Sequence, residues 1–287
     1  MTTLYEEVRA TLRESKFRPR KRLGQNFLVH ENIIDSILRL LDLSVEDEIV
    51  EIGPGLGFLT RRLVDTAKKV YAVEIDSALV DRLERSALSS NPAFRLIHND
   101  ILKVAPDDFL PPHKVKLVGN LPYSISSPVL FRLFEWHPHF SSLVLMVQKE
   151  VADRITSLPG TKAYGTLSVW CQVHGRIVEK LSVSPEAFFP KPKVRSTILK
   201  LNLYPEPLIA AKELPLLRRL IRSAFGQRRK TLGNALATSL QRDRNEIDSL
   251  LRLAGIDPMR RGETLSAEEF LALTYALQTS PLLSADD

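Results

Sequence analysis

Apolar residues follow two different spacings along the first half of the chain. Short uninterrupted apolar runs, typical of strands buried on both faces, are separated by stretches in which apolar residues recur every three or four positions. The runs predict strands at residues 48–52, 70–75, 94–98, 115–119 and 143–147. The helical spacing predicts helices at 31–43, 57–67, 77–87 and 128–136. This alternation indicates an α/β fold with a mostly parallel sheet and helices on both faces.

The pattern changes after Leu203. Residues 168–178 and 194–203 still predict strands, and Tyr204-Pro205-Glu206-Pro207 follows. Beyond this point helical spacing recurs at 214–225, 229–240, 244–254 and 267–277, and we expect no further strand. We therefore predict three parts: a basic N-terminal arm with the start of a ligand site (1–30), a Rossmann-like domain (31–203) and a small all-α C-terminal domain (204–287).

Composition narrows the class of protein. The chain has 287 residues, of which 44% are hydrophobic and 26% charged, which is ordinary for a globular protein. It offers no apolar run of the roughly 20 residues that a membrane helix needs, and its first residues do not resemble a signal peptide. The single cysteine, Cys171, excludes an internal disulfide. We expect a cytoplasmic protein.

Positive charge is concentrated in two runs. The formal net charge is +6 and the pI is about 9.4. The N-terminal run is Arg13, Lys16, Arg18, Arg20, Lys21 and Arg22, and the second is Arg218, Arg219, Arg222, Arg228, Arg229 and Lys230. Such a run can merely solvate a helix face, but two of them flanking a domain with catalytic motifs favour a polyanionic partner. We expect Arg222, Arg228, Arg229 and Lys230 to bind RNA.

A glycine-rich turn joins the first predicted strand to the next helix. Its sequence is Glu51-Ile52-Gly53-Pro54-Gly55-Leu56-Gly57. A dinucleotide fingerprint would need a third glycine at position 58, which is Phe58. The G-x-G-x-G spacing instead resembles the S-adenosylmethionine loop of class I methyltransferases, and we assign Gly53, Gly55 and Gly57 to cofactor binding.

Polar side chains at the ends of the next two strands complete this cofactor site. Glu74 can accept hydrogen bonds from both hydroxyls of a ribose, and Ile75 can pack on the adenine ring. Asp100 can accept from the adenine amino group. Ligands of open α/β sheets bind at the carboxyl ends of such strands. The alternative is that Glu74 and Asp100 only cap helices or form turns.

Asn120-Leu121-Pro122-Tyr123 follows the fourth predicted strand and resembles the N/D-P-P-Y motif of amino-methyltransferases. An exocyclic adenine amine is a poor nucleophile because its lone pair is delocalised into the ring. Hydrogen-bond acceptors from Asn120 and from the Leu121 or Pro122 carbonyl would favour its attack, and Tyr123 can stack on a base taken out of its helix. We assign Asn120, Pro122 and Tyr123 to catalysis, with Asn120 also at the cofactor.

A second aromatic group stands in Ala187-Phe188-Phe189-Pro190-Lys191-Pro192-Lys193-Val194. Phe188 could cover the face of the flipped adenine opposite Tyr123, and we include it among the catalytic residues. The alternative is a buried Phe pair that fixes the loop, which is the favoured interpretation for Phe189.

These landmarks together resemble the ribosomal RNA adenine dimethylase family, in particular its bacterial kasugamycin-sensitivity branch. Leu23-Gly24-Gln25-Asn26-Phe27-Leu28 is similar to the family's opening motif, and Phe225–Leu232 to its C-terminal basic motif. The resemblance covers about residues 23–235. It implies that Asn26 and Leu28 contact the cofactor, and that two adjacent adenosines near the 3′ end of 16S rRNA are dimethylated. Arg195 and Thr166 depart from the family's usual residues.

Two rival functions remain open. A 23S rRNA adenine methylase of the macrolide-resistance type shares the glycine loop and the Asn-x-Pro-Tyr turn, and a mainly non-catalytic ribosome-assembly protein would also bind RNA. We expect S-adenosylmethionine as the cofactor, a pre-30S particle as the partner, a monomer, an added role in ribosome biogenesis and no metal. The apolar surroundings of Cys171 indicate a core residue in a strand rather than a nucleophile.

Overall fold

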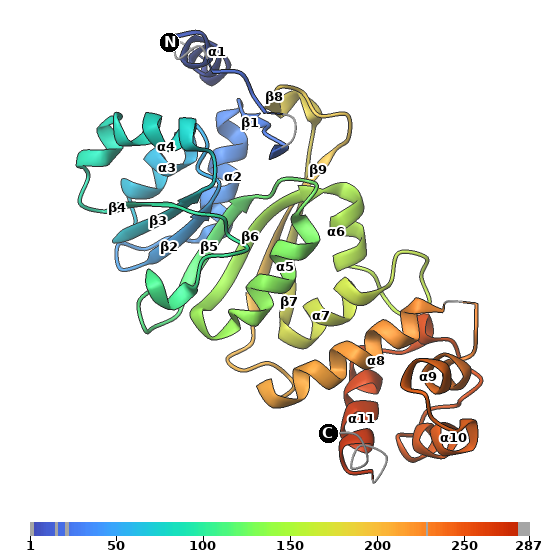
Figure 1. Cartoon of the computed structure of the whole chain (residues 1–287). Coiled ribbons are helices and arrows are strands. Elements are labelled where there is room, and N and C mark those ends of the chain that lie inside the picture. Colours follow the sequence, from blue (N-terminus) through green and yellow to red (C-terminus); the bar gives the residue numbers. More distant parts are fainter. Residues whose placement is uncertain (1–2, 15–16, 21–22, 228, 281–287) are drawn as a thin grey trace. The chain divides into compact units, whose positions relative to one another are not determined.

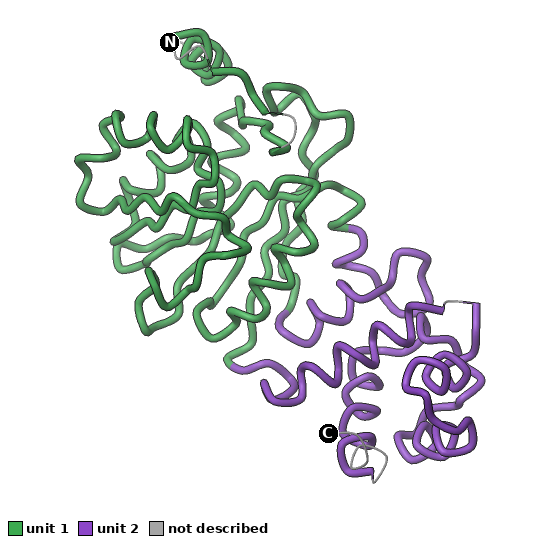
Figure 2. Tube along the Cα trace, in the orientation of Figure 1, with its two compact units in different colours: residues 1–152, 176–205 green, residues 153–175, 206–287 purple. Residues whose placement is uncertain are grey.

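The chain divides into two compact units. The structure is a computed structural model that describes residues 3–14, 17–20, 23–227 and 229–280. The first unit comprises Met1–Ala152 and Arg176–Pro205, and the second Asp153–Gly175 and Glu206–Asp287 (Figure 2). The sequence placed residues 153–175 in the Rossmann-like domain, whereas the structure groups them with the C-terminal helices.

A seven-stranded sheet forms the centre of the first unit (Figure 1). Its order is β4-β3-β2-β5-β6-β9-β7. The strands β2 to β6 pair in parallel, and β9 runs antiparallel to β6. The strands are β2 (Glu48–Ile52), β3 (Lys69–Glu74), β4 (Phe94–His98), β5 (Val115–Asn120), β6 (Phe140–Gln148), β7 (Gly175–Val183) and β9 (Ser196–Leu203). The strands predicted between residues 48 and 147 are therefore confirmed, with shifts only at their ends.

Helices flank this sheet (Figure 1). They are α2 (Glu31–Leu41), α3 (Phe58–Val64), α4 (Ser77–Glu84), α5 (Ser126–Glu135) and α6 (Lys149–Ile155). From α2 and α3, Ile37, Leu40 and Leu63 enter one core with buried residues of β2, β3, β5 and β6. The chain leaves β2 toward β3 and β4 on one side, and β5 lies on the other side. The carboxyl ends of β2 and β5 therefore mark a topological switch point, where open α/β sheets bind ligands.

The N-terminal segment is built into the first unit. It begins with α1 (Leu4–Glu14), which buries Leu4, Val8 and Leu12 in a core shared with Phe27. Further on, β1 (Phe27–Leu28) pairs antiparallel with β8 (Phe188–Phe189). The spacing of Leu4, Val8 and Leu12 is helical, so the sequence already held the signal for a packed helix in what we expected to be an arm.

The described part of the second unit contains only helices. Its α-helices are α7 (Thr166–His174), α8 (Leu214–Gly226), α9 (Leu232–Leu240), α10 (Arg244–Leu253) and α11 (Ala267–Gln278). The strand predicted at 168–178 is wrong for residues 168–174, which belong to α7, and correct for residues 175–178, which lie in β7. Leu167, Val169, Trp170, Cys171 and Val173 are all buried. A helix that is apolar all round lacks the periodic pattern by which a helix is recognised. The prediction that Cys171 is a core residue holds, but in a helix.

Short 3₁₀ helices connect the larger elements. They lie at Ala87–Ser90, Pro106–Asp108, His137–His139, Pro185–Ala187, Ala211–Glu213 and Gly262–Thr264.

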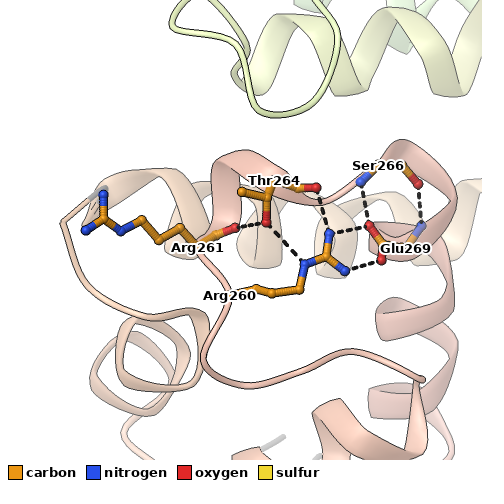
Figure 3. Close-up of polar contacts among 5 residues, drawn as sticks. All are labelled: Arg260, Arg261, Thr264, Ser266 and Glu269. Atoms are coloured by element: carbon orange, nitrogen blue, oxygen red, sulfur yellow. Dashed lines mark hydrogen bonds and ion pairs between the residues drawn. The ribbon is translucent and has the colours of Figure 1, made fainter.

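A polar network around Arg260 fixes the loop that precedes α11 (Figure 3). The Arg260 guanidinium contacts both carboxylate oxygens of Glu269 and donates to the Thr264 carbonyl at 2.7 Å. Glu269 also accepts from the Ser266 N–H at 2.8 Å, while the Ser266 hydroxyl caps the Glu269 N–H at 3.2 Å. The same loop holds α9, since the Leu232 N–H donates to the Arg260 carbonyl at 2.6 Å.

The close approach of this loop to α8 gives a stability prediction. A Cβ at Gly262 would lie 2.7 Å from both the Cβ and the carbonyl oxygen of Ala224. Backbone would have to move, so Gly262→Ala should lower the free energy of unfolding by about 1–3 kcal/mol. A Cβ at Gly226, in α8, meets nothing within 4 Å. Gly226→Ala is therefore the matched control, and equal denaturation midpoints for the two variants would contradict the prediction.

Candidate active site

A cavity opens at the carboxyl ends of β2, β3 and β5. The segment 23–28 and the glycine-rich turn form two of its walls, and the ends of β3, β4 and β5 supply polar side chains. Of the residues predicted from the sequence, it brings together Asn26, Leu28, Gly53, Gly55, Glu74, Ile75, Asp100, Asn120 and Pro122. Residues nearly one hundred positions apart in the chain thus line one cavity.

The three glycines of the turn differ in what their missing side chains leave room for. Gly53 and Gly55 have φ of 69° and 60°, which favours glycine, and a Cβ at Gly53 would meet nothing within 4 Å. The backbone at Gly53 is therefore open to a ligand. A Cβ at Gly55 would lie 3.2 Å from the Phe27 ring. Gly57 does not line the cavity. It precedes α3 with a φ of 84°, and it leaves room for Leu83, because a Cβ added at Gly57 would lie 2.9 Å from the Leu83 Cδ2.

The Glu74 carboxylate is held at the end of β3 by backbone donors. Its Oε2 accepts from the Gly55 N–H at 3.2 Å, and its Oε1 from the N–H groups of Ile75 at 3.0 Å and Asp76 at 2.9 Å. Glu74 is buried, which raises the pKa of its carboxyl, while the three N–H donors lower that pKa in part. A carboxylate has about four acceptor positions, so about one position of Glu74, on Oε2, is left for a hydroxyl donor from a ligand.

Glu51, which sequence reasoning did not assign to the site, lines the same cavity. It is 2% exposed, and its Oε2 has no hydrogen-bond partner among the described residues. Burial raises the pKa of the Glu51 carboxyl to about 8, the Thr60 hydroxyl lowers it and the Glu74 carboxylate raises it further. The signal was present in the sequence, because Glu51 stands between two apolar residues, Val50 and Ile52, just before a glycine turn, and acids are seldom fully buried.

Ile75 and Asp100 stand on the side of the cavity formed by β3 and β4. Ile75 is 48% exposed although it is a large apolar residue, so its side chain is available to a flat apolar ligand. The Asp100 Oδ1 accepts from the Leu102 N–H at 3.0 Å, which fixes the carboxylate in a turn. The turn-forming and ligand-binding interpretations of Asp100 are therefore compatible, because Oδ2 is not part of that hydrogen bond.

The Asn120 side chain is oriented by the backbone of the N-terminal segment. Its Nδ2 donates to the Asn26 carbonyl at 3.0 Å. A carbonyl only accepts, so this contact assigns the amide and leaves Oδ1 as the acceptor. The Pro122 carbonyl already accepts from the Ser126 hydroxyl and the Ile125 N–H, both at 3.1 Å. Of the two carbonyls considered from the sequence, Leu121 is the better candidate for an amine.

Tyr123 and Phe188 do not line the cavity. Tyr123 is half-buried, and its hydroxyl lies 2.8 Å from the Ser196 Oγ, which ties the turn after β5 to the start of β9. Phe188 is 3% exposed and belongs to the core beneath α2. Phe189 packs edge-on against Tyr5, with ring centroids 6.2 Å apart. Core packing is thus the structural role of Phe188, and its stacking on a base stays a prediction.

The predicted RNA-binding residues lie in the helical unit. Arg222 is exposed on α8, and Arg229 and Lys230 are exposed in the turn before α9. Arg228 lies outside the described residues.

The model of one protein family, described as ribosomal RNA adenine dimethylase, matches residues 16–278. This match spans both units and every motif of the cavity. The chain belongs to the ribosomal RNA adenine dimethylase family.

This dimethylase has relatives that are named as ribosomal RNA methyltransferases. It is 43% identical over 258 residues to the ribosomal RNA small subunit methyltransferase A of Clostridium botulinum, covering 89% of this chain and 92% of that protein. It is 42% identical over 270 residues to the protein of that name from Geobacter metallireducens, covering 93% and 98%. Membership of this family makes the protein an S-adenosylmethionine-dependent methyltransferase that acts on adenine in ribosomal RNA.

Solved structures resemble the dimethylase over most of its length. A dimethyladenosine transferase from Plasmodium falciparum superposes with a TM-score of 0.76 at 26% identity, covering 88% of this chain and 97% of that one. The 23S rRNA methyltransferase ErmE gives a TM-score of 0.65 at 28% identity, covering 88% and 100%.

The described residues contain no group of three or more His, Cys, Asp or Glu side chains that could hold a metal ion. Within the same residues, no helix is long and apolar enough to cross a bilayer.

The buried Glu51 carboxyl predicts a pH-dependent stability of the dimethylase. The Glu51 carboxyl has an ordinary pKa of 4.5 in the unfolded chain and a pKa of about 8 in the folded protein. Between these two pH values the unfolded chain has lost the Glu51 proton, whereas the folded protein keeps it. Stability should therefore fall as the pH rises through this window. Glu51→Gln removes the effect, so the variant should exceed the wild type by about 1–3 kcal/mol at pH 8 and match it near pH 4.5.

Chemical denaturation of both proteins at several pH values measures this difference. Because every other titrating group is shared, it cancels between the two proteins. A stability difference that stays constant from pH 4.5 to 8 would show that Glu51 does not keep its proton in the folded protein.

Proposed function

We propose that this dimethylase transfers methyl groups from S-adenosylmethionine to the N6 amino groups of two adjacent adenosines near the 3′ end of small-subunit rRNA. The substrate is a pre-30S particle in the cytoplasm, on which the enzyme acts as a monomer and also serves ribosome biogenesis. The single observation that carries the chemistry is the Asn120 side chain, oriented by the Asn26 carbonyl with Oδ1 as its acceptor beside the cavity.

The charge of the cavity favours a cationic ligand. Its lining includes the Glu74 and Asp100 carboxylates together with the Glu51 carboxyl, and none of its lining residues in the described chain is Lys or Arg. A dinucleotide would bring an anionic pyrophosphate next to these carboxylates, whereas S-adenosylmethionine carries a sulfonium and an ammonium group. When bound, this cofactor supplies an electrophilic methyl group.

The remaining contacts also fit that cofactor. Glu74 would accept from a ribose hydroxyl, Ile75 would cover the adenine ring and Asp100 would accept from the adenine amine. Gly53 leaves room for close approach of the ligand to the backbone. Asn26 and Leu28 also line the cavity.

The residues after β5 would activate the acceptor amine. Asn120 Oδ1 and the Leu121 carbonyl would accept its two hydrogens, which directs the nitrogen lone pair toward the methyl group. Pro122 restricts the turn, and Tyr123 would stack on the extruded base. No strong general base is needed, because the nitrogen becomes acidic only after it has been methylated.

The choice of ribosomal subunit follows from the relatives. Proteins at 42–43% identity are named small subunit methyltransferases, whereas ErmE, a 23S rRNA methyltransferase, is 28% identical. This difference favours the small subunit over the macrolide-resistance alternative. An assembly role without methylation is disfavoured by the complete set of Asn120, Glu74 and Asp100 at one cavity.

Methyl mapping on ribosomes tests this function. Undermethylated small subunits and large subunits are incubated with enzyme and isotopically labelled S-adenosylmethionine, and labelled adenines are located by mass spectrometry. We expect dimethylation of two adjacent adenosines in the small subunit. The Asn120→Ala control should methylate about 10²–10³-fold more slowly, because one positioned acceptor is lost. Label in the large subunit, or none in either, would reject the proposal.

The exposed basic residues of the helical unit predict electrostatic RNA binding. Replacing Arg229 and Lys230 with Ala should weaken binding to small subunits and reduce the slope of log affinity against log salt by at most about 2, because phosphate contacts release counterions. Lys212→Ala with Arg252→Ala removes two other exposed cations of the same unit and is the matched control. Binding measured at several salt concentrations with equal slopes for both double variants would exclude a specific basic surface.

A further inference from the structure

Asn120 depends on a main-chain atom that no side-chain substitution removes. Its Nδ2 donates to the Asn26 carbonyl, so the position of that carbonyl decides where Oδ1 points. Asn26 belongs to residues 23–26, in which Leu23 and Gly24 form a turn and Gln25 and Asn26 lie in no helix or strand. Something outside a helix or strand must therefore hold this segment still.

A buried carboxylate at the end of β3 anchors the segment. Asp76 is 1% exposed, and its Oδ2 accepts from the Gln25 Nε2 at 2.7 Å. Its Oδ1 lies 2.9 Å from the Arg20 guanidinium and also accepts from the Ala78 N–H at 3.1 Å as the N-cap of α4. Buried charges are costly unless paired, so these partners fit a position that is closely defined.

Gln25 connects that anchor to the chain on either side. While its Nε2 donates to Asp76, its Oε1 accepts from the Arg20 N–H at 2.7 Å. The amide is thus used at both ends and closes the segment into a loop over Asp76. Asn26 follows directly, and its side chain turns back to donate to the Gly24 carbonyl at 2.9 Å.

Gly24 brings the loop against the acceptor turn. It has a φ of 62°, and an added Cβ would lie 3.3 Å from the Pro122 Cβ. The loop is therefore held at two places, by hydrogen bonds to Asp76 and by packing on Pro122. Between these places lies the carbonyl that orients Asn120.

We propose that Asp76 and Gln25 are positioning residues for methyl transfer, which act through the Asn26 carbonyl to keep the Asn120 Oδ1 turned toward the acceptor amine. This inference rests on the proposed function of Asn120. Gln25 lines the cavity, but both ends of its amide bond to protein groups, and Asp76 does not line the cavity. They remove alternative rotamers of a catalytic amide, and misplacing a reacting group by about 1 Å can cost roughly 10²-fold in rate.

Two variants separate this role from ordinary stabilisation. Gln25→Leu keeps a side chain of similar size without its hydrogen bonds. Asp76→Ala removes the anchor together with a helix N-cap, so Asp243→Ala is the matched control: Asp243 caps α10 by accepting from the Asn245 N–H at 2.7 Å and lies in the helical unit. Both Asp→Ala variants should lose about 1 kcal/mol of stability from the cap alone.

The single-turnover rate at saturating cofactor and saturating small subunits is the first readout. Gln25→Leu and Asp76→Ala should be slower than wild type by about 10- to 100-fold, while Asp243→Ala keeps the wild-type rate. Adding Gln25→Leu to Asn120→Ala should slow the reaction no further, because the positioned group is already gone. Additive losses in the double variant, or a wild-type rate for Gln25→Leu, would overturn the proposal.

A second readout needs no methyl transfer. The side-chain NH₂ resonances of Asn120 are assigned by their absence in Asn120→Ala. In the wild type one of these hydrogens should be protected from exchange by the Asn26 carbonyl, and Gln25→Leu should reduce that protection. Unchanged protection in Gln25→Leu would overturn the positioning role. If Gln25→Leu reduces the protection of the Asn120 NH₂ group but the wild type methylates neither subunit, the proposed substrate is rejected. The positioning of Asn120 by Gln25 and the Asn26 carbonyl is then still supported.

Discussion

One short segment, residues 23–28, contacts the loops that follow β2, β3 and β5 at the cavity. Phe27 faces Gly55 of the glycine turn, Gly24 faces Pro122, Gln25 bonds Asp76, and the Asn26 carbonyl receives Asn120. Leu28 pairs with Phe188. Parallel strands bring their carboxyl ends to one edge of a sheet, but they do not fix the loops that follow. A common partner for those loops supplies the missing constraint.

Burial sets the electrostatics of the site. Glu51 and Glu74 stand at the ends of neighbouring strands within one cavity, and burial raises the pKa of both carboxyls. Backbone N–H groups stabilise the charge of Glu74, whereas Glu51 has Thr60 beside it and a raised pKa of about 8. A cationic ligand beside these carboxyls would favour their charged forms. Groups with pKa values shifted by burial are characteristic of binding sites.

The helical unit achieves its stability differently. Its polar network around Arg260 and Glu269 fixes one loop, and that loop in turn holds the start of α9 beside Arg229 and Lys230. Because pairing with Arg260 lowers the pKa of Glu269, the acid stays charged and the network persists near neutral pH. The exposed Arg229 and Lys230 thus directly precede a helix whose start is hydrogen-bonded to this loop.

Local pattern was enough to predict the parallel strands, the G-x-G-x-G turn and the acidic residues at successive strand ends, because these depend on neighbours in the chain. It failed for α7, whose residues are buried on all sides and show no helical period. It did not assign Glu51 to the cavity or Phe188 to the core, because the burial of both side chains depends on packing between distant segments. The orientation of Asn120 by a carbonyl 94 positions away was decided only by tertiary structure, because no local pattern encodes a contact between distant segments.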